Sequence, residues 1–207
     1  MLLFEGFKKQ YGSTTIISVP TLELPHGIYW LKGENGSGKT TLIKSISGLI
    51  PFDGRIAVDG TDIKTNRMAY TLSVNYAEAE PVYPGFLSGT DLINFYAQTK
   101  KAPAKQVTEL ISSLGIANYA DNKTGTYSSG MAKKLSLVLG FMGNPKLILL
   151  DEPLITLDQR SVAALQSLIQ QCYVGGVSFL ITSHQEITFD TLMPTRLLIE
   201  DKTLIRA

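Results

Sequence analysis

Gly33-Glu34-Asn35-Gly36-Ser37-Gly38-Lys39-Thr40-Thr41 is the stretch that decides the fold of this 207-residue chain. It follows the apolar run 28–31 and precedes the run 42–49, so the pattern predicts a strand, a glycine loop and a helix, the context of a phosphate-binding P-loop. The alternative is a glycine-rich turn that caps an ordinary strand–helix unit. We disfavour it because every fixed position of the P-loop pattern is filled and both flanks fit. The sequence therefore predicts a nucleotide-binding site.

Each part of the loop has an expected role. Glycines allow positive φ, which turns backbone N–H groups toward phosphate oxygens, and the helix that begins near Lys39 adds the positive end of its dipole. We expect Lys39 to reach the β- and γ-phosphates, Thr40 to place its hydroxyl on Mg²⁺, and Thr41 to be a further phosphate ligand. The other predicted nucleotide-binding positions of the loop are Gly33, Asn35, Gly36, Ser37 and Gly38.

Composition sets the broad class. The chain is 44% hydrophobic and 18% charged, which is typical of a soluble globular protein. A formal net charge of +1 gives no support for nucleic-acid binding, because the chain is not a markedly basic domain. Cys172 is the only cysteine, so we expect neither an intrachain disulfide nor a cysteine-cluster metal site. We find no signal-peptide pattern and no apolar run near the roughly 18 residues of a membrane span, so a membrane role requires a partner.

The order of patterns along the chain indicates an α/β protein with an insert. Residues 1–30 read as a small β layer, and strand patterns continue to about residue 77. From about 88 to 143 the periodicity is helical, with Thr90 or Asp91 expected to cap the first helix. The continuous apolar run that ends at Leu150 then suits a strand buried on both faces of a parallel sheet.

Two acids and a histidine follow buried strands. Asp151 and Glu152 end the strand predicted at 146–150, where open α/β sheets place their ligand sites. Asp151 fits the carboxylate that holds Mg²⁺ in a P-loop NTPase, and Glu152 fits a general base that takes a proton from the attacking water. His184 ends a later strand, and its position alone leaves a structural and a functional role equally open.

The sequence resembles the ATP-binding subunit of an ABC transporter, nearly from end to end. The P-loop matches the Walker A motif of that family, and the run 146–153 matches its Walker B strand and catalytic glutamate. The remaining family positions are the signature at Tyr127-Ser128-Ser129-Gly130-Met131, the D-loop at Leu157-Asp158, the switch histidine at His184 and the adenine-stacking aromatic at Tyr11. Spacing alone favours a different reading of Tyr11, a hairpin aromatic that covers core, and the resemblance reverses that preference.

The resemblance implies the fold: a P-loop NTPase core with a mostly parallel sheet, an N-terminal antiparallel β layer and an inserted helical subdomain. We expect a single ABC ATPase domain over 1–207, with the nucleotide-binding core at 1–84 and 144–207 and the helical subdomain, carrying the signature, at 85–143.

The chain departs from the family at two places. In the signature, Ser129 replaces a glycine and Met131 a glutamine, whereas Ser128 and Gly130 keep the positions that hold the γ-phosphate from the opposite subunit. The Q-loop glutamine falls on Ala79, whose side chain can neither orient water nor contact Mg²⁺. Either Glu78 or Glu80 substitutes for the Q-loop glutamine, or the role of that glutamine is weak in this chain.

The resemblance further implies ATP and Mg²⁺ as cofactors and two partners. One partner is a second ATP-binding subunit, identical or different, and the other is an integral membrane permease that docks near residues 78–95. The subunit is then expected in the cytoplasm, peripheral on the inner face of the cell membrane, and its short length resembles exporter-type members.

Two other functions remain open on the sequence. A soluble ABC-type ATPase acting on nucleic acid or ribosomes is disfavoured by the single nucleotide-binding domain, the missing coiled-coil insert and the missing basic stripe. A non-hydrolysing regulatory module is disfavoured by the intact Lys39, Asp151, Glu152 and His184, although Ala79 keeps it open.

Overall fold

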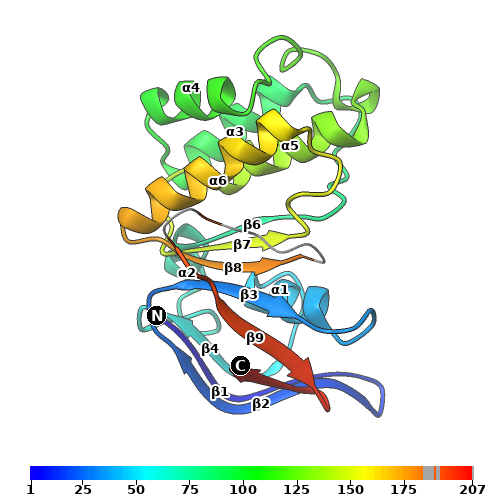
Figure 1. Cartoon of the computed structure of the whole chain (residues 1–207), viewed down its shortest axis with the longest axis vertical. Coiled ribbons are helices and arrows are strands. Elements are labelled where there is room, and N and C mark those ends of the chain that lie inside the picture. Colours follow the sequence, from blue (N-terminus) through cyan, green and yellow to red (C-terminus); the bar gives the residue numbers. More distant parts are fainter. Residues whose placement is uncertain (184–188, 190–191, 207) are drawn as a thin grey trace.

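The structure is a computed structural model that describes residues 1–183, 189 and 192–206 (Figure 1). In chain order its elements are β1 (Leu2–Tyr11), β2 (Thr14–Leu24), β3 (Ile28–Lys32), α1 (Lys39–Ile46), β4 (Asp53–Val58), β5 (Thr61–Asp62), α2 (Arg67–Ser73), β6 (Val74–Ala77), α3 (Gly89–Lys100), α4 (Ala104–Ser113), the 3-10 helix η1 (Thr124–Thr126), α5 (Ser129–Gly140), β7 (Leu147–Asp151), α6 (Gln159–Val174), β8 (Ser178–Thr182), β9 (Thr195–Glu200) and β10 (Thr203–Arg206).

A six-stranded sheet runs through the middle of the molecule in the order β10-β9-β3-β8-β7-β6. Its neighbours from β9 to β6 are parallel, and β10 pairs with β9 as an antiparallel hairpin. Every residue of β7 and β8 is buried, which explains why their sequences are apolar runs rather than alternating patterns. Because parallel strands end at the same edge, Lys32, Asp151 and Thr182 end β3, β7 and β8 on one side of the sheet.

A second sheet, antiparallel and ordered β2-β1-β4-β5, forms the predicted N-terminal β layer. It lies at the lower end of Figure 1, where both chain termini are also found. Its two long strands, β1 and β2, span 10 and 11 residues and make up most of the layer that the sequence indicated at residues 1–30.

Two hydrophobic cores lie on the two faces of the six-stranded sheet. One joins α1, through Leu42, Ile43 and Ile46, to both sheets. The other joins four helices, α3, α4, α5 and α6, to the opposite face of the same sheet, as Figure 1 shows. Alternate residues of β7 enter different cores: Leu149 packs with α1, and Ile148 packs with the helices. The helix that follows the P-loop and the later helices are therefore separated by the sheet.

The predicted α/β fold is confirmed, with two local corrections. The cap of α3 is Ser88, which forms a reciprocal capping box with Asp91, so the expected cap at Thr90 or Asp91 was wrong by two or three residues. Helix α2 was missed because it is seven residues long and buries only Tyr70. The subdomain limits at 85 and 143 stay a prediction, although α3, α4 and α5 fall between them. No helix among the described residues is both long enough and apolar enough to span a membrane.

Candidate nucleotide-binding site

The loop between β3 and α1 carries the predicted phosphate-binding residues. Gly36 and Gly38 have φ of 80° and 104°, which glycine adopts without steric strain. A Cβ atom at Gly33 would lie 2.5 Å from Ser37 Oγ, and one at Gly38 would lie 3.0 Å from Cγ2 of Ile16. The backbone path of this loop therefore depends on its three glycines.

Lys39 and Ser37 supply side-chain chemistry to the loop. The Lys39 Nζ donates to the carbonyl oxygens of Gly33 and Glu34, at 2.7 and 3.0 Å. The buried hydroxyl of Ser37 has no hydrogen-bond partner among the described residues. Helix α1 begins at Lys39, so the positive end of its dipole faces the loop. An ammonium group, an unpartnered hydroxyl and a helix N-terminus around one loop fit an anionic ligand of the phosphate type.

The other predicted P-loop side chains lie at the surface of the same segment. Asn35 and Thr40 are exposed, and Thr41 is half-buried on the first turn of α1. That turn contains no acidic residue, so no carboxylate on it opposes a phosphate. The contacts assigned to Asn35, Thr40 and Thr41 stay predictions.

Asp151 is the last residue of β7, on the side of the sheet where β3 ends and the P-loop begins. Only 2% of it is exposed. Thr182 Oγ1, at the end of β8, donates to Asp151 Oδ1 at 2.6 Å, and the Tyr76 hydroxyl on β6 lies 3.4 Å from Oδ2. Burial, together with the nearby Asp151 carboxylate, raises the pKa of Tyr76, so the phenol keeps its proton and can donate. The carboxylate is thus held in place from two neighbouring strands.

Glu152 follows directly and has an unusual backbone. Its φ is 44°, in the left-handed region that residues other than glycine rarely adopt. Its N–H donates to the carbonyl oxygen and the hydroxyl of Thr182, at 3.1 and 2.9 Å. Thr182 therefore fixes both acids at once, a role that sequence reading did not assign to it. These bonds hold the backbone of Glu152, and a carboxylate is the kind of group that can take a proton from water.

Lys133, on α5, is a second residue that sequence reading missed. It is 1% exposed, and its Nζ donates to the carbonyl oxygens of Glu78, Ala79 and Asp151, at 2.7, 3.2 and 2.8 Å. Burial lowers the pKa of Lys133 to about 8, although the carboxylates of Asp151 and Glu152 oppose that shift. The sequence offered no local signal, because Lys133 is one of two adjacent lysines, Lys133 and Lys134, in the predicted helical region.

The segment after β6 has alanine where the family has glutamine. The Glu78 N–H donates to Ser136 Oγ at 3.1 Å, which ties this segment to α5. Glu78 is half-buried and close enough to Tyr76 to raise the pKa of that phenol, whereas Glu80 is exposed. Of the two proposed substitutes for the glutamine, Glu78 thus lies beside the acid pair. Its role there stays a prediction.

The signature segment forms the N-terminus of α5. Ser128 is the N-cap, and its Oγ accepts the backbone N–H three residues on, at 3.2 Å. A Cβ atom at Gly130 would lie 3.0 Å from the carbonyl oxygen of Thr156, so the close approach of these segments favours glycine. Ser128 is exposed, and α5 packs against the face of the sheet opposite to α1. The structure does not bring Ser128 and Lys39 together within one chain.

Asp158 links the D-loop to the signature helix. It caps α6 by accepting the backbone N–H and the hydroxyl of Ser161, and it pairs with Lys134 Nζ at 2.7 Å. The hydrogen bond from Lys134, with those from Ser161, holds the pKa of Asp158 well below its usual range. The D-loop and α5 are thus joined by a charged hydrogen bond in the same chain.

Tyr11 lies at the end of β1, next to the hairpin turn. It is 55% exposed, so the interpretation of Tyr11 as a core-covering aromatic was wrong. The Lys9 Nζ lies 4.5 Å from the ring centroid, which leaves a planar ring at the surface beside a cation. The predicted stacking on adenine stays a prediction. His184 lies outside the described residues.

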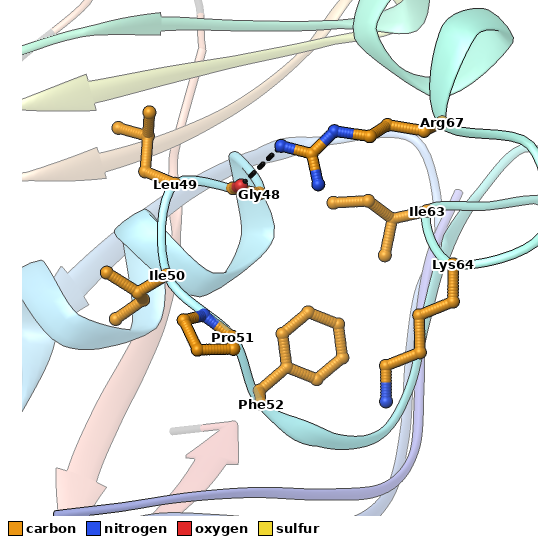
Figure 2. A pocket seen from close by; sticks show the side chains of 8 residues that line it. All are labelled: Gly48, Leu49, Ile50, Pro51, Phe52, Ile63, Lys64 and Arg67. Atoms are coloured by element: carbon orange, nitrogen blue, oxygen red, sulfur yellow. Dashed lines mark hydrogen bonds between the residues drawn. The ribbon is translucent and has the colours of Figure 1, made fainter.

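One pocket of about 430 Å³ lies away from this site, and Figure 2 shows its lining. It is lined by the segment after α1 and by Ile63, Lys64 and Arg67, and Arg67 donates to the carbonyl oxygen of Gly48 at 3.1 Å. The Lys64 Nζ lies 4.7 Å from the centre of the Phe52 ring. This pocket is at the C-terminal end of α1, opposite to Lys39, so it is not the phosphate site.

A larger groove, of about 530 Å³, lies next to the acid pair, and its lining includes Tyr76, whose hydroxyl contacts Asp151. Its apolar lining comes from the segment after α1 and from α2, β6 and α3, and includes Leu49, Met68, Tyr76, Phe95 and Tyr96. Met68 and Phe95 are 79% and 63% exposed, respectively, which is unusual for large apolar side chains.

Together, the fold and these residues define a P-loop nucleotide-binding protein of the α/β class. Residues 20–155 match the ABC transporter family. The chain therefore belongs to the ABC transporter family, and the resemblance to the ATP-binding subunits of such transporters is confirmed.

Several curated relatives are similar over most of the chain. The linearmycin resistance ATP-binding protein LnrL of Bacillus subtilis is 30% identical over 91% of this chain and 63% of its own length. The bacitracin transport ATP-binding protein BcrA of Enterococcus faecalis is 30% identical over 87% of the chain and 60% of its own length. The chain thus spans about three-fifths of these two relatives.

Solved structures support the fold. An ATP-binding subunit of an ABC transporter superposes with a TM-score of 0.90 at 20% identity, over 100% of this chain and 89% of its own. A dimeric ATP-binding cassette bound to ADP and phosphate gives a TM-score of 0.84 at 16% identity, over 99% and 96%.

Proposed function

We propose that the chain binds and hydrolyses ATP to drive an ABC exporter. The observation that carries the proposal is the meeting of three strand ends at one edge of the sheet: β3 leads into the P-loop, β7 ends at Asp151, and β8 ends at Thr182. This arrangement brings Lys39, for the phosphates, to the same side of the sheet as two acids. Asp151 serves the metal ion and Glu152 serves the attacking water.

Lys39 and Asp151 have distinct roles in this proposal. Lys39 binds the β- and γ-phosphates, and the Thr40 hydroxyl with the Asp151 carboxylate holds Mg²⁺. One carboxylate and one hydroxyl are sufficient protein ligands for Mg²⁺, because this ion usually takes its other ligands from water and substrate phosphates. In keeping with that, no cluster of three His, Cys, Asp or Glu side chains suited to a metal occurs among the described residues. When bound, the ion neutralises charge on the phosphates.

Glu152 is the proposed general base. It accepts a proton from the water that attacks the γ-phosphate, while the Thr182 hydrogen bonds keep its backbone in the left-handed conformation that directs the side chain. Tyr11 is proposed to stack on the adenine, and His184 to sense the γ-phosphate.

A second ATP-binding subunit completes each site. Ser128 and Gly130, at the N-terminus of α5, are proposed to contact the γ-phosphate held by the opposite subunit, and Asp158 lies at the same interface. The separation of α1 and α5 by the sheet supports this arrangement. The γ-phosphate then favours the closed dimer because it binds both subunits only in that state.

The apolar groove beside the acid pair is proposed to dock the permease. It overlaps the expected docking region at Phe95 and extends it to Leu49 and Met68. The subunit then acts in the cytoplasm, on the inner face of the membrane. Two relatives named for antibiotic resistance or antibiotic transport support export as the direction.

Glu152→Gln tests the proposal. The variant is expected to bind ATP as the wild type does and to hydrolyse it roughly 10²–10⁴-fold more slowly, the usual contribution of a positioned base. Glu109→Gln, the same change on exposed α4, is the control and should keep the wild-type rate. Wild-type turnover by Glu152→Gln would place the base elsewhere, and a wild-type chain that binds but never hydrolyses ATP would favour a regulatory module.

A further inference from the structure

Lys133 connects three segments that lie far apart in the sequence. Its Nζ donates to the carbonyl oxygens of Glu78 and Ala79 after β6 and to that of Asp151 at the end of β7, while its backbone belongs to α5. An ammonium group has three N–H donors, and here each has a backbone acceptor within 3.2 Å. The side chain therefore fixes the position of α5 relative to the other two segments.

One of these bonds acts on the peptide group that precedes Glu152. The carbonyl oxygen of that peptide is the Asp151 oxygen bound by Lys133, and its N–H is the Glu152 N–H bound by Thr182. The peptide plane is thus held from both sides. A residue other than glycine keeps a left-handed conformation only where its surroundings fix it, and Glu152 has φ of 44°.

We propose that Lys133 is a positioning residue for ATP hydrolysis, one that sets the orientation of Glu152 and couples it to the position of α5. The inference rests on the proposed function of Glu152 as the base. A shift of α5 would move the peptide that carries the base and, through the same ammonium group, the segment at Glu78 and Ala79.

The same ammonium group connects the segment after β6 to Glu152 by a route that does not use the missing glutamine. The Ala79 side chain has no hydrogen-bonding group, yet the Ala79 carbonyl oxygen shares Lys133 with the carbonyl oxygen of Asp151. A displacement at the groove next to Tyr76 and Glu78 can therefore reach Glu152 through backbone hydrogen bonds.

Lys100 offers a matched control. It is also a partly buried lysine whose Nζ donates to backbone carbonyl oxygens, those of Thr71 and Val74, and burial likewise lowers its pKa to about 8. Its acceptors precede or begin β6 rather than flank the acid pair. Lys100→Met thus removes a similar structural bridge without touching Asp151 or Glu152.

The experiment compares Lys133→Met with Lys100→Met in the full chain. ATP affinity is measured by calorimetry, turnover by phosphate release, and folding by thermal denaturation. Lys133→Met is expected to bind ATP within about 2-fold of wild type and to lose roughly 10–100-fold in kcat, as expected for a misplaced catalytic group. Lys133→Gln, which keeps two donors, should fall between Lys133→Met and wild type, whereas Lys100→Met should keep the wild-type kcat.

A double variant separates positioning from general destabilisation. If Lys133 acts through Glu152, then Lys133→Met combined with Glu152→Gln should hydrolyse ATP within about 2-fold of Glu152→Gln alone in single-turnover assays with labelled ATP. Losses that multiply would overturn the inference, as would a wild-type kcat for Lys133→Met, or for Lys133→Gln if the Met variant does not fold. A wild-type rate for Glu152→Gln would instead refute the proposed base itself.

Discussion

Thr182 and Asp151 are joined by a short side-chain hydrogen bond, with Thr182 Oγ1 donating to Asp151 Oδ1 at 2.6 Å. The same hydroxyl accepts the Glu152 N–H at 2.9 Å. A single oxygen, buried at the end of β8, therefore orients the proposed metal-binding carboxylate and the backbone of the proposed base.

Thr182→Val should raise the Mg²⁺ concentration needed for half-maximal ATP hydrolysis by roughly 10-fold. The valine keeps the shape of the side chain but no longer orients the Asp151 carboxylate, and partners that orient metal ligands typically contribute 10–100-fold. The free energy of unfolding should fall by about 1–3 kcal/mol, because the buried Asp151 Oδ1 loses its partner and the Glu152 N–H keeps only the Thr182 carbonyl oxygen. Titration of ATPase activity with Mg²⁺ measures the first effect. Thr182→Ser keeps the hydroxyl and should need the same Mg²⁺ concentration as the wild type. An unchanged Mg²⁺ dependence in Thr182→Val would contradict the role assigned to Thr182.

Local sequence patterns were sufficient to predict the P-loop and the acid pair. The glycine spacing at 33–38 follows from backbone geometry that the structure confirms, with positive φ at Gly36 and Gly38. The apolar run that ends at Asp151 predicted a strand buried on both faces, and β7 is such a strand. In each case the chemistry and the fold depend on neighbouring residues.

Contacts between distant segments could not be predicted in this way. Lys133 meets its acceptors across 55, 54 and 18 residues, and nothing in the helical periodicity of α5 identifies these partners. The cap of α3 was misplaced because Ser88, Thr90 and Asp91 are all acceptable caps, and only the reciprocal bond between Ser88 and Asp91 selects one. The exposure of Tyr11 likewise depends on how far β1 continues before its turn.

Lys100 should make stability depend on pH above neutrality. Burial lowers its pKa to about 8 in the folded chain from about 10.5 when unfolded, so between these values the unfolded chain binds more protons. The free energy of unfolding contributed by Lys100 must therefore rise with pH in this window. Because the side chain is partly solvated, we expect the wild type to gain about 1 kcal/mol relative to Lys100→Met between pH 7 and 9.5.

Urea denaturation of both proteins across this range measures that difference. Lys133 is present in both chains, so its own contribution cancels. Stability curves that stay parallel from pH 7 to 9.5 would show that the Lys100 ammonium remains charged in the folded protein.

Ser128→Arg tests whether the site is shared between two subunits. Ser128 is exposed at the N-terminus of α5, and its helix lies across the sheet from the helix that begins at Lys39. The substitution should therefore leave the ATP affinity of a single chain within about 2-fold of wild type. It should lower ATP hydrolysis by roughly 10-fold or more, because the arginine fills the space that the γ-phosphate of the facing subunit requires. Ser112→Arg, on the exposed surface of α4, is the matched control and should hydrolyse ATP normally.

Mixing Ser128→Arg with Lys39→Ala makes the test specific. In a mixed dimer one composite site carries both changes and the other carries neither, so one intact site is rebuilt. ATP hydrolysis by the mixture should exceed the sum of the two variants measured separately, provided that one working site allows the dimer to close. Phosphate release at a series of mixing ratios should then peak near equal amounts. Full wild-type activity of Ser128→Arg alone would refute the shared site, since the arginine would then lie outside any surface that the nucleotide needs.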